Sequence, residues 1–223
     1  GITLSADSQP ILDDRDRQPG GLTRRSWVML AAGLSLLGVL TIVGGLGALY
    51  YYAAQPMPVT AQDRSAIVDI HHLAEWIEDY VPEERGEVLS KTKYLDGSYD
   101  LEYEYDRPDD DTEPYLYCSV TVDQNETDAH ASFRGMLEGM KLGLKFLAEG
   151  DTNLVPRPDV FAWGDESQFA LVEFEGAPIG NMFIAREQKN TFYFVVYGVY
   201  FDDHDAVHDL LSERLMRLRG YRP

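Results

Sequence analysis

The chain has 223 residues, of which 38 are acidic and 19 basic, so its formal net charge is −19. Such a charge repels phosphate backbones, which excludes nucleic acid as a partner. The hydrophobic content of 44% suffices for a packed core. The one cysteine, Cys118, excludes an intramolecular disulfide. We expect Cys118 to be a buried apolar side chain; an intermolecular disulfide or a reactive thiol is the alternative.

Residues 1–25 form a polar tail with four acidic and four basic side chains, so the net charge resides after it. Residues 26–54 are predicted to hold a single transmembrane helix. No charged residue occurs from 26 to 62, and the 23 residues from Trp27 to Leu49 are almost wholly apolar or small. About 20 such residues cross the hydrocarbon core of a bilayer.

Basic and aromatic residues flank this span as they do at membrane interfaces. They are Arg24, Arg25, Trp27, Tyr50, Tyr51 and Tyr52. Because the arginines precede the span, the positive-inside rule predicts a cytoplasmic N-terminus. The chain is then a single-pass protein of the inner (plasma) membrane with its C-terminal domain in the periplasm or an equivalent extracytoplasmic space.

Two alternatives concern export. Ala53-Ala54 suggests a signal-peptide cleavage site, but the apolar run is longer than the usual 7–15 residues. The segment Thr23-Arg24-Arg25-Ser26-Trp27 is similar to a twin-arginine signal.

The predicted span carries small residues along one stripe. Small side chains let a second helix approach closely in lipid, although glycine is also simply tolerated in membrane helices. The stripe predicts contact with another membrane subunit through Ala31, Ser35, Gly38, Gly45 and Ala48.

After a short linker at 55–60, residues 61–223 are predicted to form one acidic α+β domain. Helical and alternating hydrophobic periods give the order α-βββ-α-βββ-α. About six strands are expected to form a mostly antiparallel sheet flanked by helices. The predicted helices are 67–80, 126–149 and 205–219, and the strands are 88–95, 99–105, 115–122, 168–174, 179–186 and 191–201.

Several local signals support these boundaries. Asp96-Gly97 and Lys189-Asn190 are predicted turns, and Asn125 is a predicted helix cap. The stretch with Pro156 and Pro158 is predicted to be irregular. Three glycines four residues apart, Gly135, Gly139 and Gly143, predict close packing of the long helix against the sheet or a partner.

The second half of the domain resembles the PsbP-like class of extracytoplasmic proteins. The resemblance rests on the run Ile179-Gly180-Asn181-Met182-Phe183-Ile184-Ala185-Arg186, a turn, the strand 191–201 and the C-terminal helix. It covers at most Val88 to Leu218 and rests on element order. It implies an α/β/α sandwich that serves assembly or docking, usually without catalysis. The membrane helix departs from the soluble members of that class.

Candidate chemistry is sparse. His204 and His208 are four residues apart beside Asp203, a spacing that suits a metal on one helix face; an acid-rich helix start is the simpler interpretation. The acids between Asp106 and Glu113 suit Ca²⁺ or a solvated loop. His71-His72 point to different sides of a helix. No phosphate loop, nucleophile elbow or HExxH motif occurs.

These observations lead to a first hypothesis, a non-catalytic accessory subunit that stabilises or assembles a larger membrane complex, photosynthetic or respiratory. It predicts no cofactor, and partners in other membrane subunits and the lipid bilayer. The second hypothesis is a membrane-anchored ligand-binding or sensor domain with a pocket near Trp163 and the tyrosines. The third is a metalloprotein or enzyme that uses His204 and His208.

Overall fold

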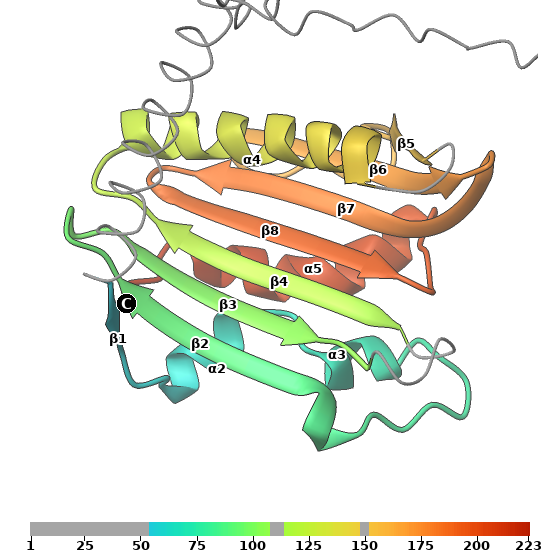
Figure 1. Cartoon of the computed structure of the whole chain (residues 1–223), viewed down its shortest axis with the longest axis horizontal. Helices are drawn as coiled ribbons and strands as arrows, with labels where there is room; N and C mark the ends of the chain where they lie inside the picture. Colours follow the sequence, from blue (N-terminus) through green and yellow to red (C-terminus); the bar gives the residue numbers. More distant parts are fainter. Residues whose placement is uncertain (1–53, 108–113, 148–151) are drawn as a thin grey trace, which may run out of the picture. The chain divides into compact units, whose positions relative to one another are not determined.

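The computed structural model describes residues 54–107, 114–147 and 152–223, which belong to one compact unit. These residues form an α+β domain around one antiparallel sheet of eight strands (Figure 1). Along the sheet the strand order is β1-β2-β3-β4-β8-β7-β6-β5.

The elements follow the chain in a simple order. The first half contains β1 (Gln55–Pro56), α2 (Ala61–Ala66), α3 (Ile70–Ala74), a 3-10 turn (Glu84–Gly86), β2 (Glu87–Lys93), β3 (Tyr99–Tyr105) and β4 (Tyr115–Val122). The second half contains α4 (Glu126–Leu147), β5 (Thr152–Pro156), β6 (Glu166–Phe174), β7 (Ala177–Glu187), β8 (Asn190–Tyr197) and α5 (His204–Leu218).

The sheet is two meanders of four strands each that meet at β4 and β8. At this central junction Cys118 lies opposite Phe194, and both side chains are buried. The prediction that Cys118 is buried is therefore confirmed. Both central strands are apolar on the face that forms the main core, as expected for strands covered by neighbouring layers.

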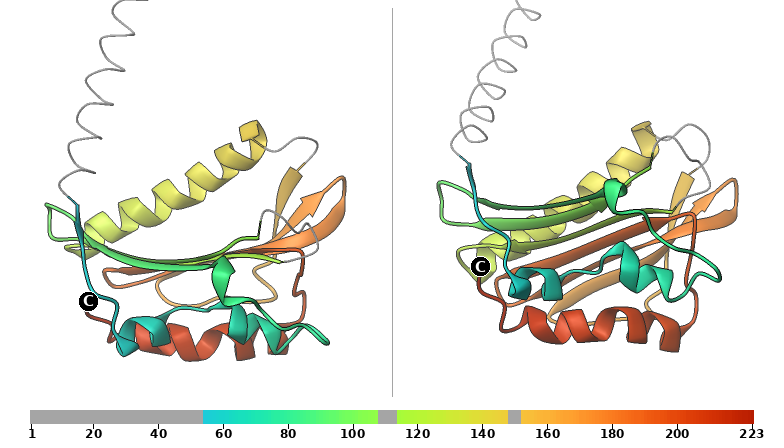
Figure 2. Two further views of the ribbon diagram at one scale, coloured as in Figure 1. Left: turned by 60° about the horizontal axis from the view of Figure 1, so that its bottom comes forward. Right: turned by 90° about the horizontal axis from the view of Figure 1, so that it is seen from below.

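One face of the sheet, the helix-covered face, carries α2, α3 and α5 (Figure 2). Its core gathers Ile67 from the link between α2 and α3, Ile70 and Leu73 from α3, and Leu211 and Leu215 from α5. These side chains are at most 1% exposed. Burial of this kind supplies the main driving force for folding.

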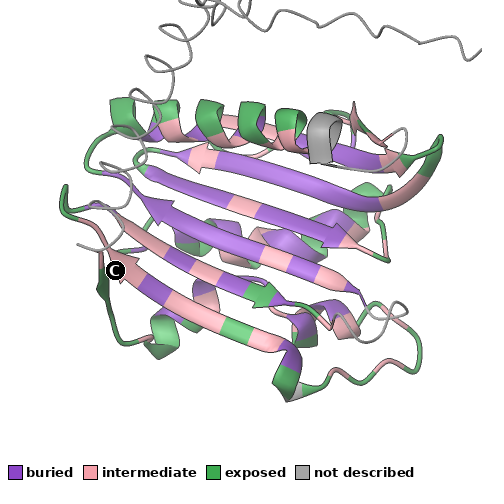
Figure 3. Ribbon diagram, viewed as in Figure 1, coloured by how far each residue is buried: buried purple, intermediate pink, exposed green. Residues whose placement is uncertain are grey.

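On the opposite face, the open face, α4 is the only helix among the described residues, and it packs over β7 and β8. Phe133 and Leu137 of α4 contact a cluster that includes Met182, Ile184 and Val195. Above β2 and β3 the described chain places no helix, and residues there are partly exposed (Figure 3). Half of this face is therefore uncovered within the described domain.

A buried ion pair ties α2 to the sheet and to the C-terminus. Lys91 lies with its ammonium 3.1 Å from both carboxylate oxygens of Asp63, and the Tyr221 hydroxyl donates to the same carboxylate at 2.5 Å. The Lys91 and Asp63 side chains are 5% and 1% exposed. Thr60 donates its backbone N–H to Asp63 in a capping box. The charge of Asp63 is thus fully compensated by its neighbours.

The prediction of six strands is wrong, because β1 and β5 add one strand at each edge. The linker at 55–60 begins with β1, which pairs with β2, and the stretch expected to be irregular contains β5, which pairs with β6. Each added strand ends in a proline, Pro56 or Pro156. Proline is tolerated at sheet edges because its missing N–H faces no partner.

The helix predicted over 67–80 is much shorter, since only α3 lies within that range, and the preceding helix α2 was not predicted. Thr60 and Asp69 each begin a helix with a capping box, and Ile67 between them is extended, with φ −111° and ψ 160°. The apolar residues at helical spacing face the core as predicted up to Leu73, whereas Trp76 is 42% exposed.

Two of the remaining boundary predictions are confirmed and two are wrong. Asp96-Gly97 forms the β2–β3 turn and Asn125 accepts hydrogen bonds at the start of α4, both as predicted. The last strand ends at Tyr197 rather than 201, since Gly198 has a φ of +87°. The turn before it is Gln188-Lys189, because Asn190 already pairs with Glu187.

Candidate functional site

Four tyrosines lie together on the open face where β4 and β8 meet. Tyr115 and Tyr117 come from β4, and Tyr193 and Tyr197 from β8. Even spacing places the two tyrosines of each strand on one face. Tyr115 lies directly opposite Tyr197 in the register. Pairing of β4 with β8 therefore assembles the cluster.

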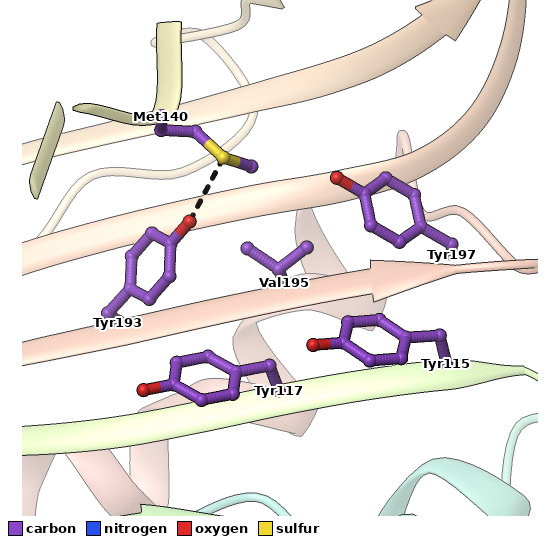
Figure 4. A pocket seen from close by; sticks show the side chains of 6 residues that line it. All are labelled: Tyr115, Tyr117, Met140, Tyr193, Val195 and Tyr197. Carbon is purple, nitrogen blue, oxygen red and sulfur yellow. Dashed lines mark hydrogen bonds between the residues drawn. The ribbon is translucent and has the colours of Figure 1, made fainter. Parts of the chain in front are cut away.

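These rings surround a shallow pocket of about 260 Å³, the tyrosine pocket, with Val195 between the tyrosines and Met140 of α4 at one side (Figure 4). Tyr115 stacks on Tyr197 with 5.8 Å between ring centroids. Tyr117 and Tyr193 meet edge to face at 5.9 Å. The Tyr193 hydroxyl lies 3.1 Å from the Met140 sulfur. The lining is aromatic with hydroxyl tips.

Carboxylates of β3 extend the polar side of the pocket. The Tyr117 hydroxyl donates to Glu102 at 2.8 Å, and the Tyr115 hydroxyl donates to Glu104 at 3.2 Å. Burial raises the pKa of both phenols well above the usual value, and the neighbouring glutamates raise it further. Both tyrosines are consequently neutral donors at physiological pH, and they orient the two carboxylates.

The glycine stripe of α4 does not pack as predicted. A Cβ added at Gly135, Gly139 or Gly143 meets no described atom within 4 Å. The prediction that these glycines allow close packing on the sheet is therefore wrong, because α4 turns its larger residues, such as Leu137, to the sheet. Contact of the stripe with a partner stays a prediction.

The three metal-ligand candidates make separate local contacts at the start of α5. Asp203 caps α5 by accepting from the backbone of Asp205 and Ala206. His204 bonds through Nδ1 to the Val160 carbonyl at 2.7 Å, and His208 lies 3.5 Å from Asp209. The two imidazoles are neighbours, with 6.0 Å between centroids. Across the described ranges, no three His, Cys, Asp or Glu side chains gather in a way that suits a metal ion.

The other ligand candidates are the pair His71-His72 and the acids from Asp106 to Glu113. His72 completes the cap of α3, while His71 lies 3.0 Å from Glu87. Asp106 is exposed at the end of β3, and the acids at 109–113 lie outside the described residues.

The predicted tail, transmembrane span and interfaces also lie outside the described residues, which begin at Ala54. This applies to the helix-packing residues Ala31, Ser35, Gly38, Gly45 and Ala48, and to the interface residues Arg24, Arg25, Trp27, Tyr50, Tyr51 and Tyr52. Among the helices that the structure does describe, none has the length and apolar character needed to cross a bilayer.

The sequence predicted a pocket near Trp163 and the tyrosines; four tyrosines line the pocket together with Val195 and Met140, and Trp163 does not. Trp163 packs against the core of the helix-covered face and donates to Glu187 at 3.3 Å. Alternation within each strand placed Tyr115 with Tyr117, and Tyr193 with Tyr197. The missing information was the β4–β8 pairing, which joins strands about 75 residues apart along the chain.

Comparison with known proteins gives no relative: no family model, curated protein or solved structure matches this chain.

Proposed function

We propose that this chain is a non-catalytic binding subunit of a membrane protein complex, and that its domain docks a partner protein on the open face of the sheet. One observation carries the proposal. The half of that face formed by β2 to β4 has no covering layer in the described domain, and the aromatic pocket lies at its border with β8. Aromatic side chains in a shallow pocket are typical anchor points of protein interfaces.

The size of the tyrosine pocket favours a protein partner over a free ligand. Pockets for drug-sized ligands occupy about 300–1,000 Å³, whereas this one measures about 260 Å³ and opens onto the sheet face. Such a volume suits one side chain of a partner. The alternative, a sensor domain for a small ligand, is thus the second choice.

The predicted span from Trp27 to Leu49 supplies the membrane part of the proposal. An extracytoplasmic domain held next to the bilayer meets membrane neighbours at high effective concentration. A weak docking face is then sufficient for a stable complex. The docking role implied by the resemblance to the PsbP-like class is of the same kind as the role proposed here.

The test compares two exposed apolar residues on opposite faces in the full chain. Val88 lies on the open face and is 60% exposed; Met216 lies on α5 and is 61% exposed. We expect Val88→Arg to remove the chain from its complex on native electrophoresis after mild detergent extraction, and Met216→Arg to leave it there. Both variants should stay folded, because exposed substitutions change stability by about 0.5 kcal/mol or less.

Two results would contradict the proposal. One is a wild-type chain that migrates alone after gentle extraction. The other is a complex that survives Val88→Arg but is lost with Met216→Arg, which would move the docking face to α5.

A further inference from the structure

Three carboxylates on the open face of β3 have no basic partner among the residues that the structure describes. Asp100, Glu102 and Glu104 alternate along the strand and so point to the same side. None of them forms an ion pair with a residue that the structure describes. Arg107, at the end of the strand, pairs with Glu83 at 3.0 Å instead. The region beside the tyrosine pocket is therefore strongly negative.

The hydrogen bonds on these groups leave acceptor positions unused. The tyrosine hydroxyls donate to Oε1 of Glu102 and of Glu104, and no described residue donates to Oε2 of either carboxylate. The Tyr197 hydroxyl likewise has no hydrogen-bond partner among described residues, and none of the described residues that line the pocket is basic. A ligand with several N–H donors would satisfy these acceptors.

We propose that the tyrosine pocket receives an arginine side chain from the docked partner. This inference rests on the proposed function and identifies what the partner presents. Aromatic ring faces attract cations within about 6 Å of the ring, and the four rings form such a surface. The adjacent carboxylates add the charge complementarity that selects a cation over a neutral side chain.

Arginine fits better than lysine for geometric reasons. A guanidinium is planar, so it stacks on tyrosine rings while its N–H fork reaches carboxylates at its edge. Glu102 and Glu104 are two residues apart on one strand, about 7 Å along it, and both flank the rings through their tyrosine hydrogen bonds. An ammonium is a compact point charge and stacks on a ring less well.

The experiment uses the full chain in detergent micelles, with tyrosine rings isotopically labelled for NMR. The probe is the peptide Gly-Arg-Gly amide, and the matched control is the same peptide with citrulline, the neutral isostere of arginine. We expect the arginine peptide to shift the ring signals of Tyr115, Tyr117, Tyr193 and Tyr197, with Kd on the order of millimolar, since one side chain makes the contact. The citrulline peptide should bind at least about tenfold more weakly.

A pair of variants tests the carboxylates without changing side-chain shape. The double variant Glu102→Gln/Glu104→Gln should weaken arginine binding about tenfold, since charge-assisted hydrogen bonds are roughly twice as strong as neutral ones. The control removes two charges from the opposite side of the sheet, Glu75→Gln/Glu78→Gln, where both residues are exposed, and should leave binding unchanged.

Several outcomes would overturn this inference: no ring shifts with arginine, equal binding of the citrulline peptide, equal losses in both double variants, or tighter binding of a lysine peptide or of choline chloride. The last result would identify the occupant as another amine or a lipid headgroup. If the tyrosine rings do not respond but Val88→Arg still breaks the native complex, the inference fails and the proposed docking function stands.

Discussion

The helix-covered face and the open face of the sheet are built from alternate residues of the same strands. On β3, Leu101, Tyr103 and Tyr105 turn to the covered face and are at most 2% exposed. Their sequence neighbours Asp100, Glu102 and Glu104 turn to the open face, and Glu104 is exposed. One strand thus serves a core on one side and solvent or a partner on the other. The covered face holds the main core, and the open face is the one to which we assign recognition under the proposed function.

The largest expected effect lies on the covered face. Phe194 is 1% exposed at the centre of the sheet, and Phe194→Ala should lower the free energy of unfolding by about 3–5 kcal/mol, because it deletes buried contacts and leaves a cavity. Val88→Ala on the open face should change it by about 0.5 kcal/mol or less. Urea denaturation of the full chain in detergent, followed by tryptophan fluorescence, measures both. Equal losses would remove the distinction between the faces.

The buried ion pair should give the next largest loss. Lys91→Met leaves the buried Asp63 carboxylate without its cation, so we expect about 3–5 kcal/mol of destabilisation in the same assay. The double variant Lys91→Met/Asp63→Asn should recover part of this loss, because the buried charge is gone. A double variant less stable than Lys91→Met would show that the hydrogen bonds of Asp63, not its charge, dominate.

A smaller change in the free energy of unfolding should accompany a fall in pH. Burial alone raises the pKa of Asp63, but hydrogen bonds from Tyr221, Thr60 and Lys91 outweigh it and hold the pKa below the ordinary value of 3.8. The stabilisation is therefore fully present above about pH 3.8 and is lost as the pH falls through the lower folded pKa. As the pH falls through this acidic range, the free energy of unfolding should decline less steeply in Asp63→Asn than in the wild-type chain. Identical slopes in both proteins would exclude Asp63 as the source.

The smallest effect should be a gain on the open face. An added Cβ at Gly139 meets no described atom within 4 Å, so Gly139→Ala should stabilise the domain by roughly 1 kcal/mol through helix propensity. Thermal unfolding measures this gain. In the native membrane, the same substitution tests whether the glycine stripe of α4 contacts a partner. If Gly139→Ala stabilises the domain but removes the chain from its complex, the stripe contacts a partner. Destabilisation of the domain itself would mean that the helix packs more closely than the structure indicates.

Most elements were predictable because their signals are local. Asn125 capped α4 as expected, Asp96-Gly97 made its turn, and the alternation in β3 and β8 identified their faces. Errors occurred where short elements depend on a neighbour. The two-residue strand β1 and the proline-containing β5 exist because β2 and β6 offer edges to pair with. In the same way, the capping box of Asp69 begins α3 three residues after the predicted start at Ile67, and the capping box of Thr60 begins α2, which the apolar period did not predict.

By itself, the sequence determined the acidic charge, the α+β class, the apolar faces of the long strands and the lone buried cysteine. These properties depend on composition and on periods of two or 3.6 residues, which are local. Only the tertiary structure decided that β4 pairs with β8, that α4 covers half of one face, and that four tyrosines meet beside carboxylates that have no ion pair among the described residues. Strand pairing across such a separation depends on the packing of the whole core, and no local period encodes it.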